Sequence, residues 1–245
     1  MSQLTGNISG WPDEAVIFPV TSIDVRVSDE PHPYLLSHTA EVAANWEREV
    51  AANPALFDGR MLLMRALEIR DGAISGECHI VPFSAFLLWR KTRPAGAAIH
   101  LFGLPVVVSS DGAVIAIRMG QHTANPGRVY CAAGSLDPDD IRDGYCDIDG
   151  NMAREVLEET GLSLSNATSV SEFHGWHGQD VVTLFRAYHF AATAVELIER
   201  IDAHIAADPD PEIDAALAIR TADPGQHAYP PFMPPVLEWV FNTRR

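Results

Sequence analysis

The feature that most constrains this fold is a helix-forming run before Gly161 that carries three glutamates on one side. Glu155, Glu158 and Glu159 are spaced i, i+3 and i+4, so an α-helix brings their carboxylates onto one face. Asp149 is expected to cap the start of this helix, and Gly161 stands where a left-handed residue would end it. Like charges at this spacing destabilise an isolated helix by roughly 0.2–0.5 kcal/mol per pair. The face therefore needs solvent or a cation.

The other side of this helix is predicted to pack on a core. Its expected apolar members are Ala153, Val156, Leu157 and Thr160. For the acidic face, two interpretations remain. Either it is a solvated surface, or it holds a hard divalent cation such as Mg2+, which takes oxygen ligands and keeps waters at its other positions. The residues around the glutamates favour the cation.

The whole run from Arg154 to Leu162, REVLEETGL, resembles the second half of the Nudix box, REUxEExGU, in which U is aliphatic. Every specified position of that half is met. The resemblance implies an α/β fold, namely a Nudix-like α/β/α sandwich on a mixed sheet, preceded here by a smaller α+β N-terminal module. It also implies a metal-dependent hydrolase that cleaves a phosphoanhydride.

The first half of the box departs from the family pattern, in which a glycine is followed after five residues by a glutamate and after seven more by the arginine. Here Gly134 is followed after five residues by Asp140, and thirteen residues then separate Asp140 from Arg154. The resemblance thus implies an insertion of six residues at 141–146 and an aspartate in place of the glutamate. A loop can lengthen at modest entropic cost, so the helix can keep its place.

By the same resemblance, Glu155, Glu158 and Glu159 ligate one or more Mg2+ or Mn2+ ions. Arg154 orients these carboxylates, and Arg154, Glu158 and Glu159 are the expected catalytic residues. The metal polarises a phosphoryl oxygen and lowers the pKa of bound water. Family members often recruit one further carboxylate from a later loop, for which the eligible residues are Glu172, Glu196, Glu199 and Glu212.

The substrate is expected to be a small nucleotide-like molecule, with a nucleoside diphosphate linked to another group: ADP-ribose, a nucleoside-diphosphate sugar, a dinucleotide or coenzyme A. The segment 131–137 keeps Gly134 and Asp137 of an FPGGxxD element found in coenzyme A pyrophosphatases, and the segment 53–59 resembles one in a branch acting on UDP-sugars. The candidate substrate-binding residues are Arg118, Gln121, His122 and Gly134, with Thr123 and Asn125 as further polar contacts.

Two other functions fit the same motif. One is a Nudix-fold ligand-binding or regulatory protein with little or no turnover, which the altered first half of the box favours. The other is an isomerase that uses metal and diphosphate but leaves the anhydride intact. His174, His177 and Asp180 lie close in sequence but lack a further Cys or His partner for a tetrahedral metal site, and are expected at the surface.

The chain is predicted to form two units, an N-terminal α+β module at 1–95 and a Nudix hydrolase domain at 96–245. The boundary is the proline- and glycine-containing stretch 92–96. Expected strands are 15–20, 22–27, 60–69, 73–81, 99–108, 113–118, 169–173 and 181–190, and expected helices are 39–53, 83–91, 194–207 and 235–241. The stretch 120–150 is mostly loop by its Gly, Asp and Pro content, and 213–220 fits a strand or a helix.

The net charge of −16 argues against a nucleic-acid or anionic-membrane partner, because the long-range field repels phosphates. The three cysteines have no CxxC spacing, which favours neither a disulfide framework nor a zinc knuckle. The segment Met1–Gly6 lacks an export signal, and no apolar run is long enough for a membrane span. A cytoplasmic protein is expected, with the N-terminal module covering the substrate or forming a homodimer contact.

Overall fold

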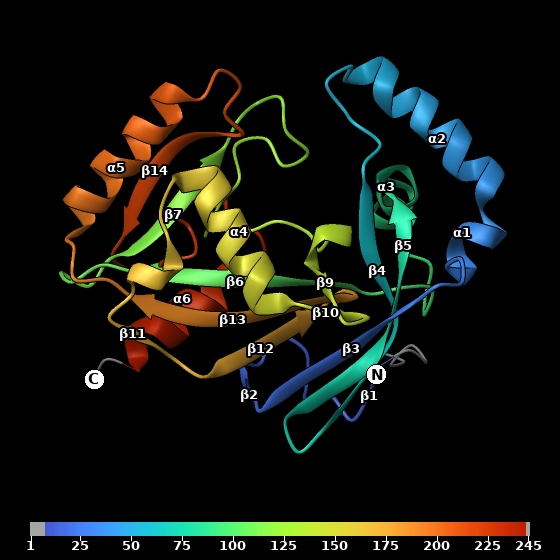
Figure 1. Ribbon diagram of the computed structural model, residues 1–245, viewed down its shortest axis with the longest axis horizontal. Coiled ribbons are helices and arrows are strands. Elements are labelled where there is room, and N and C mark those ends of the chain that lie inside the picture. Colours follow the sequence, from blue (N-terminus) through green and yellow to red (C-terminus); the bar gives the residue numbers. More distant parts are fainter. Residues whose placement is uncertain (1–7, 244–245) are drawn as a thin grey trace.

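Two mixed β-sheets, with helices packed against each, make up the computed structural model, which describes residues 8–243 (Figure 1). The central sheet has the order β14-β7-β6-β13-β12-β2. Its strands are β14 (Ile213–Ile219), β7 (Val114–Met119), β6 (His100–Val108), β13 (Val181–His189), β12 (Phe173–Gly178) and β2 (Phe18–Val20). The short strands β8 (Val129–Tyr130) and β11 (Ser169–Val170) pair with β7 and β13.

The second sheet, called here the N-terminal sheet, has the order β1-β4-β5-β3-β10-β9. Its strands are β1 (Ile8–Ser9), β4 (Arg60–Arg70), β5 (Ala73–Pro82), β3 (Ser22–Ser28), β10 (Tyr145–Cys146) and β9 (Ile141–Arg142). The helices are α1 (Pro33–Ser37), α2 (Thr39–Ala52), α3 (Phe83–Thr92), α4 (Ile148–Thr160), α5 (Ala194–Ala207) and α6 (Met233–Asn242), with 3-10 turns at Pro138–Asp140 and Leu164–Asn166.

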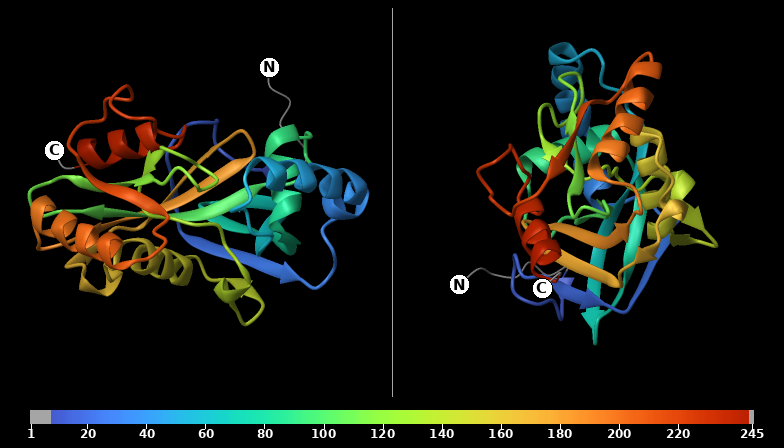
Figure 2. Two further views of the ribbon diagram at one scale, coloured as in Figure 1. Left: turned by 90° about the horizontal axis from the view of Figure 1, so that it is seen from above. Right: turned by 90° about the vertical axis from the view of Figure 1, so that its left-hand side faces the viewer.

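Helices cover both faces of the central sheet. Successive side chains of a strand point to opposite faces, so one strand can contact a helix on each side. On one face, the hydroxyl of Tyr188 lies 3.8 Å from Met152 Sδ of α4. On the other, the ring of Phe185 lies 5.2 Å from that of Trp239 in α6. The two helices are seen on opposite sides of the sheet in Figure 2. The expected α/β fold with an α/β/α sandwich on a mixed sheet is therefore confirmed.

Strands cross the predicted boundary at residues 95 and 96 in both directions. From the N-terminal side, β2 adds to the central sheet by pairing with β12. From the C-terminal side, β10 adds to the N-terminal sheet by pairing with β3. One hydrophobic cluster contains buried side chains from both sheets, and a smaller one lies between β4, β5 and helices α1 to α3. The division into 1–95 and 96–245 stays a prediction, and the sheets do not divide there.

The hairpins form as their turn sequences predict. Asp71 and Gly72, between β4 and β5, both have positive φ, at 51° and 82°. The strand expected at 169–173 is wrong in extent, because pairing with β13 continues along β12 to Gly178. The ambiguous segment 213–220 is strand β14, on the edge of the central sheet. Within residues 8–243, no helix is long and apolar enough to cross a membrane; the segment Met1–Gly6 lies outside the described residues.

Candidate active site

The six inserted residues 141–146 fold back on themselves as a hairpin. Strands β9 and β10 pair across Asp143 and Gly144, whose φ angles are 52° and 82°. At the base of the hairpin the N–H of Asp147 donates to the carbonyl of Asp140 over 2.8 Å. Because the two ends are in hydrogen-bond contact, the insertion leaves the loop before α4 closed, and it adds β10 to the N-terminal sheet at Tyr145.

Helix α4 begins two residues earlier than the sequence indicated. Its N-cap is Asp147, whose carboxylate accepts from the N–H of Gly150 over 2.9 Å. Asp149, the expected cap, instead pairs with Arg186 at 3.0 Å and lies within the helix. Gly161 ends the helix in the left-handed region, at φ 69°, as predicted.

The buried side of α4 is narrower than expected. Met152, Val156 and Thr160 form an i, i+4, i+8 row that faces β6 and is buried. At Gly103 of β6 an added Cβ would lie 2.8 Å from Met152 Cγ, so the helix approaches the sheet where the strand lacks a side chain. The prediction that Ala153 and Leu157 belong to this side is wrong, because both lie one position past the contact row and are exposed.

Asp140 anchors Arg154 from the loop. Its carboxylate is 2% exposed and accepts from Arg154 Nε at 3.2 Å and Nη2 at 2.8 Å, a side-on pair of charge-assisted bonds. It also accepts from the Asn151 side chain at 3.0 Å and from the N–H of Asp137 at 3.0 Å. The aspartate that replaces the family's glutamate is thus fully bonded within the protein, and it fixes the guanidinium beside the glutamates.

The three glutamates of the motif lie in different surroundings. Arg154 pairs with Glu155 at 2.9 Å and with Glu158 at 3.0 Å. The Glu158 side chain is 58% exposed, whereas that of Glu155 is 12% exposed. Glu155 and Glu159 line a cavity, and Glu158 does not. One oxygen of Glu159, Oε2, is buried without a hydrogen-bond partner.

Gly134 lies directly against the glutamates. A Cβ added there would lie 2.3 Å from the Glu155 carboxylate, which means that no larger residue fits without moving that side chain. The position of this glycine in the motif therefore has a steric reason. It is also the predicted substrate-binding residue that lines the cavity.

Of the four carboxylates eligible as a further ligand or base, Glu212 is the one that lines the same cavity. It precedes β14, the edge strand that pairs with β7. Glu196 instead caps α5 by accepting from the N–H of Thr193 at 2.7 Å. Glu172 and Glu199 are not among the cavity-lining residues. Sequence alone offers no means of selecting Glu212, because its place depends on how β14 pairs.

Burial and mutual repulsion raise the pKa values of two of these carboxyls, Glu155 and Glu159. Burial raises the pKa of Glu155 to about 7, and the charges of Glu158, Asp140 and Glu212 add to this while Arg154 opposes it. Burial also raises the pKa of Glu159 to about 8, with further contributions from Glu155 and Glu212. Buried carboxyls that repel one another have the electrostatics of a site for a positive ligand.

The residues fit a hard divalent cation by their chemistry. In the described part of the chain, no three His, Cys, Asp or Glu side chains are already gathered as metal ligands. However, Glu155, Glu159 and Glu212 supply carboxylate oxygens at one cavity, and Glu159 keeps one oxygen without a partner. A cation between them would relieve the repulsion that raises their pKa values.

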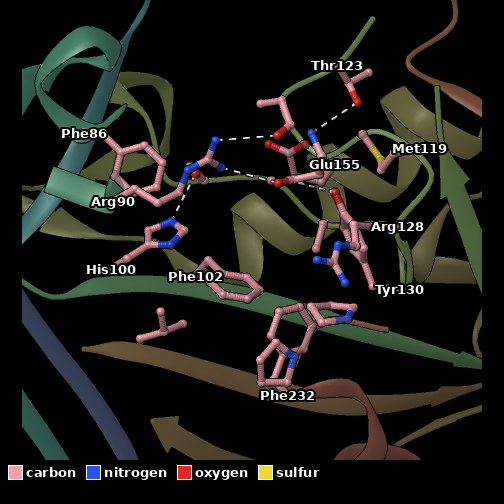
Figure 3. Close-up of a pocket in the computed structure, with 18 of the residues that line it drawn as sticks. Phe86, Arg90, His100, Phe102, Met119, Thr123, Arg128, Tyr130, Glu155 and Phe232 are labelled. Carbon is pink, nitrogen blue, oxygen red and sulfur yellow. Dashed lines mark hydrogen bonds between the residues drawn. The ribbon is translucent and has the colours of Figure 1, made fainter. Parts of the chain in front are cut away.

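The cavity has a volume of about 740 Å3 and is bounded largely by rings (Figure 3). Phe102 and Phe232 lie 5.2 Å apart along its floor, and His100 stacks on Phe102 with ring centroids 5.2 Å apart. The other aromatic lining residues are Phe83, Phe86, Tyr130 and Trp176. Aromatic walls with a few polar groups are typical of pockets for small organic ligands.

Three arginines also line the cavity: Arg90 and Arg93 of α3, and Arg128 before β8. Sequence reasoning missed them. Arg90 and Arg93 lie some sixty residues before the acidic helix, on a helix of the N-terminal module, and no local pattern connects them with it. Only the packing of α3 beside the cavity brings these arginines and the glutamates of the acidic helix to the same cavity (Figure 3).

The other predicted substrate-binding residues lie outside the cavity. Arg118 pairs with Asp214 at 2.6 Å across β7 and β14. His122 lies 3.9 Å from Asp210, and the exposed Gln121 is near Gly127. Their neighbours Thr123 and Asn125, the further expected polar contacts, do line the cavity, whereas Gln121 and His122 do not.

Comparison with known proteins gives matches in structure alone. No family model and no curated protein matches the sequence. A MutT protein from Methanosarcina mazei matches with a TM-score of 0.41 and 14% identity over 60% of this chain and 96% of that one. The Nudix domain of Shewanella oneidensis NrtR, solved with ADP-ribose, matches with a TM-score of 0.43 and 12% identity over 65% and 98%. A Nudix hydrolase from Nitrosomonas europaea matches with a TM-score of 0.37 and 17% identity over 60% and 88%. The last two are Nudix proteins by name.

Proposed function

We propose that this protein is a Nudix-type pyrophosphohydrolase that uses Mg2+ or Mn2+ to hydrolyse the phosphoanhydride of a nucleoside diphosphate linked to another group. The observation that carries the proposal is the pair Glu155 and Glu159, partly buried at a ring-lined cavity that Glu212 also lines, with Gly134 directly against Glu155. The complete REVLEETGL run that places this pair supports the same reaction.

In this proposal Glu155, Glu159 and Glu212 hold the cation at the cavity. When bound, it supplies Lewis-acid activation of the phosphoryl group and a water of lowered pKa. Glu158, a ligand by the motif, is paired with Arg154 at the cavity's edge and would join by leaving that pair. This arrangement keeps the predicted ligand set and adds Glu212 to it.

The protein's own groups then position the reaction. Asp140 fixes Arg154, and Arg154 holds Glu155 by its 2.9 Å contact. Glu212 or Glu155 accepts the proton of the attacking water, because each is a carboxylate that lines the cavity and can act as a general base there. Water oxygen bonds to phosphorus, the P–O bond of the anhydride bridge breaks, and the two products leave as phosphate monoesters. Positioning and charge neutralisation supply most of the acceleration.

The test is a turnover panel. The protein is incubated with Mg2+ and ADP-ribose, UDP-glucose, NADH, coenzyme A or a nucleoside triphosphate, and new monoester phosphate is measured by phosphatase coupling. We expect turnover of at least one member, with a loss of about 100-fold or more in Glu155→Gln and Glu159→Gln. The matched control is Glu47→Gln, an exposed glutamate of α2.

No turnover by the wild-type protein, or rates unchanged in both variants, would overturn the hydrolase assignment. Binding without turnover would favour the ligand-binding or regulatory alternative, which the altered first half of the box suggests. A product of unchanged mass would favour an isomerase.

A further inference from the structure

The two arginines of α3 form a positive end of the cavity, called here the arginine end. Arg90 and Arg93 are one helical turn apart, and both line the cavity. In Figure 3, Arg90 and His100 lie on one side of the cavity, and Tyr130 and Arg128 lie on the other. This end belongs to the N-terminal module, whereas the carboxylates belong to α4 and the segment before β14.

A row of rings leads from the arginine end into the cavity. The Arg90 guanidinium lies 5.6 Å from the centre of the Phe86 ring, and Phe86 lies 4.7 Å from His100. His100 then stacks on Phe102, and Phe102 contacts Phe232 edge-on. The row gives a flat group of a ligand an aromatic surface to stack on.

Charge effects divide the cavity in the same way. Burial is the main cause that lowers the pKa of His100, to about 3, and the charges of Arg93 and Arg90 lower it further. Burial is also the main cause that raises the pKa of Tyr130, and the charge of Glu159 raises it further. The His100 ring is therefore neutral, and its Nε2 lies 3.1 Å from Ser135 Oγ. The charges of Arg90 and Arg93 thus act on His100, whereas the charge of Glu159 acts on Tyr130, on the other side of the cavity.

The arginines that line the cavity have no ion pair in the described part of the chain, although the protein has 33 acidic residues to 17 basic ones. None of the ion pairs found among residues 8–243 includes Arg90, Arg93 or Arg128. Arg90 donates only to Asn125 Oδ1 and the Ala124 carbonyl, at 3.3 and 3.5 Å. Burial lowers the pKa of Arg90 and of Arg93, and the charges of Glu49 and Asp180 oppose this only in part, so a ligand anion would offset the desolvation that remains.

Arg93 also stands where a glycine would be favoured. It is the C-cap of α3 with φ 44°, a left-handed conformation that costs about 1 kcal/mol for a residue with a Cβ. Its guanidinium stacks on Trp89 at 4.4 Å and donates to the Gln179 carbonyl over 2.6 Å. A costly backbone that carries an arginine into a cavity is consistent with a function for that side chain.

From these observations we infer that the substrate carries a second anionic group, a phosphate or a carboxylate, remote from the anhydride and bound by Arg90 and Arg93. This inference rests on the proposed function, because it assigns the diphosphate to the carboxylate end. Arg128, on the same side as Tyr130, is the cation placed for the diphosphate itself (Figure 3). The base or another flat group occupies the ring row between the two anions.

The test compares substrates that differ by a single anionic group. The pairs are UDP-glucose with UDP-glucuronic acid, NADH with NADPH, and dephospho-coenzyme A with coenzyme A. We expect the more anionic member of at least one pair to have a kcat/KM at least 10-fold higher. The first pair tests a carboxylate and the other two a phosphate, so the pair that responds identifies the source of the anion.

Variants of Arg90 then locate the contact. Arg90→Gln should lower kcat/KM for the anionic member by about 10- to 100-fold, the range for loss of a charged hydrogen bond, and for its partner by less than 3-fold. Arg90→Lys should recover part of the loss, which a merely structural role would not predict. Arg48→Gln, an exposed arginine of α2 outside the cavity, should change neither rate. Far-UV circular dichroism confirms that each variant is folded.

Equal kcat/KM within every pair would overturn the inference, as would equal losses for both members in Arg90→Gln, since the arginines would then bind the shared diphosphate. If no pair is turned over, the proposed hydrolase function fails. Titration calorimetry of the same pairs on wild-type protein then decides the inference alone, with a 10-fold lower Kd for the anionic member supporting it and equal Kd values refuting it.

Discussion

Replacing Glu159 by glutamine should stabilise the metal-free protein at high pH while abolishing turnover. The pKa of Glu159 rises from an ordinary 4.5 to about 8, mainly by burial. Each factor of ten in an ionisation equilibrium is worth about 1.4 kcal/mol, so ionising this carboxyl in the folded protein costs about 5 kcal/mol in full. Glutamine has nearly the same shape and never ionises, so its variant avoids that cost.

The direction with pH follows from proton linkage. Because the pKa of Glu159 is higher in the folded than in the unfolded chain, the neutral carboxyl's contribution to stability is intact below about 4.5 and is lost as pH rises to about 8. The free energy of unfolding of Glu159→Gln should therefore equal that of the wild type near pH 5 and exceed it by several kcal/mol near pH 9. Urea unfolding in EDTA, followed by tryptophan fluorescence, measures both.

Added Mg2+ should narrow the gap at pH 9, because a cation that binds the folded, ionised site stabilises the wild type by mass action. Glu158→Gln is the matched control: Glu158 is largely exposed and the variant keeps Glu159, so its free energy of unfolding should follow the wild-type dependence on pH. Parallel pH profiles for wild type and Glu159→Gln in EDTA would refute the view that these carboxyls are buried against one another without a cation.

Two further substitutions test how the site is positioned. Gly134→Ala should displace the Glu155 carboxylate, which an added Cβ would approach to 2.3 Å, and lower kcat at least 10-fold; steady-state kinetics that match the wild type would contradict this. Asp140→Asn leaves the Arg154 guanidinium without its most buried anion, at 2% exposure. It should cost about 3 kcal/mol of unfolding free energy and lower kcat more than it raises KM, whereas a change in KM alone would assign Asp140 to substrate binding.

The acidic helix could be predicted because its signals are local. The glutamate spacing and the terminal Gly161 lie within a few residues of one another. The differences are the N-cap, which is Asp147 and not Asp149, and the exposure of Ala153 and Leu157. The motif could not reveal how the surroundings of the three glutamates differ. Glu155 and Glu159 are partly buried and Glu158 is exposed because of how α4 is turned against β6.

The rest of the site depends on contacts between distant segments. Glu212 was one of four eligible carboxylates, and its selection follows from the pairing of β14 with β7. Arg90 and Arg93 reach the cavity because α3 packs beside it, a contact that no pattern within α3 reveals. Hydrophobic periodicity locates an element and its buried face, but it carries no information about which other element lies opposite.

The hairpin at 141–146 makes the two halves of the chain inseparable in practice. A fragment starting at residue 96 would lose β3, the strand that β10 pairs with, and β2, which covers the outer edge of β12. It would also lose β4, whose Leu62 N–H bonds to the Leu136 carbonyl in the loop leading to the site. Domain shuffling or truncation at the apparent linker would thus expose two strand edges and loosen the loop that fixes Arg154. The module in front of the acidic helix is a part of the scaffold of the candidate site that recombination cannot exchange on its own.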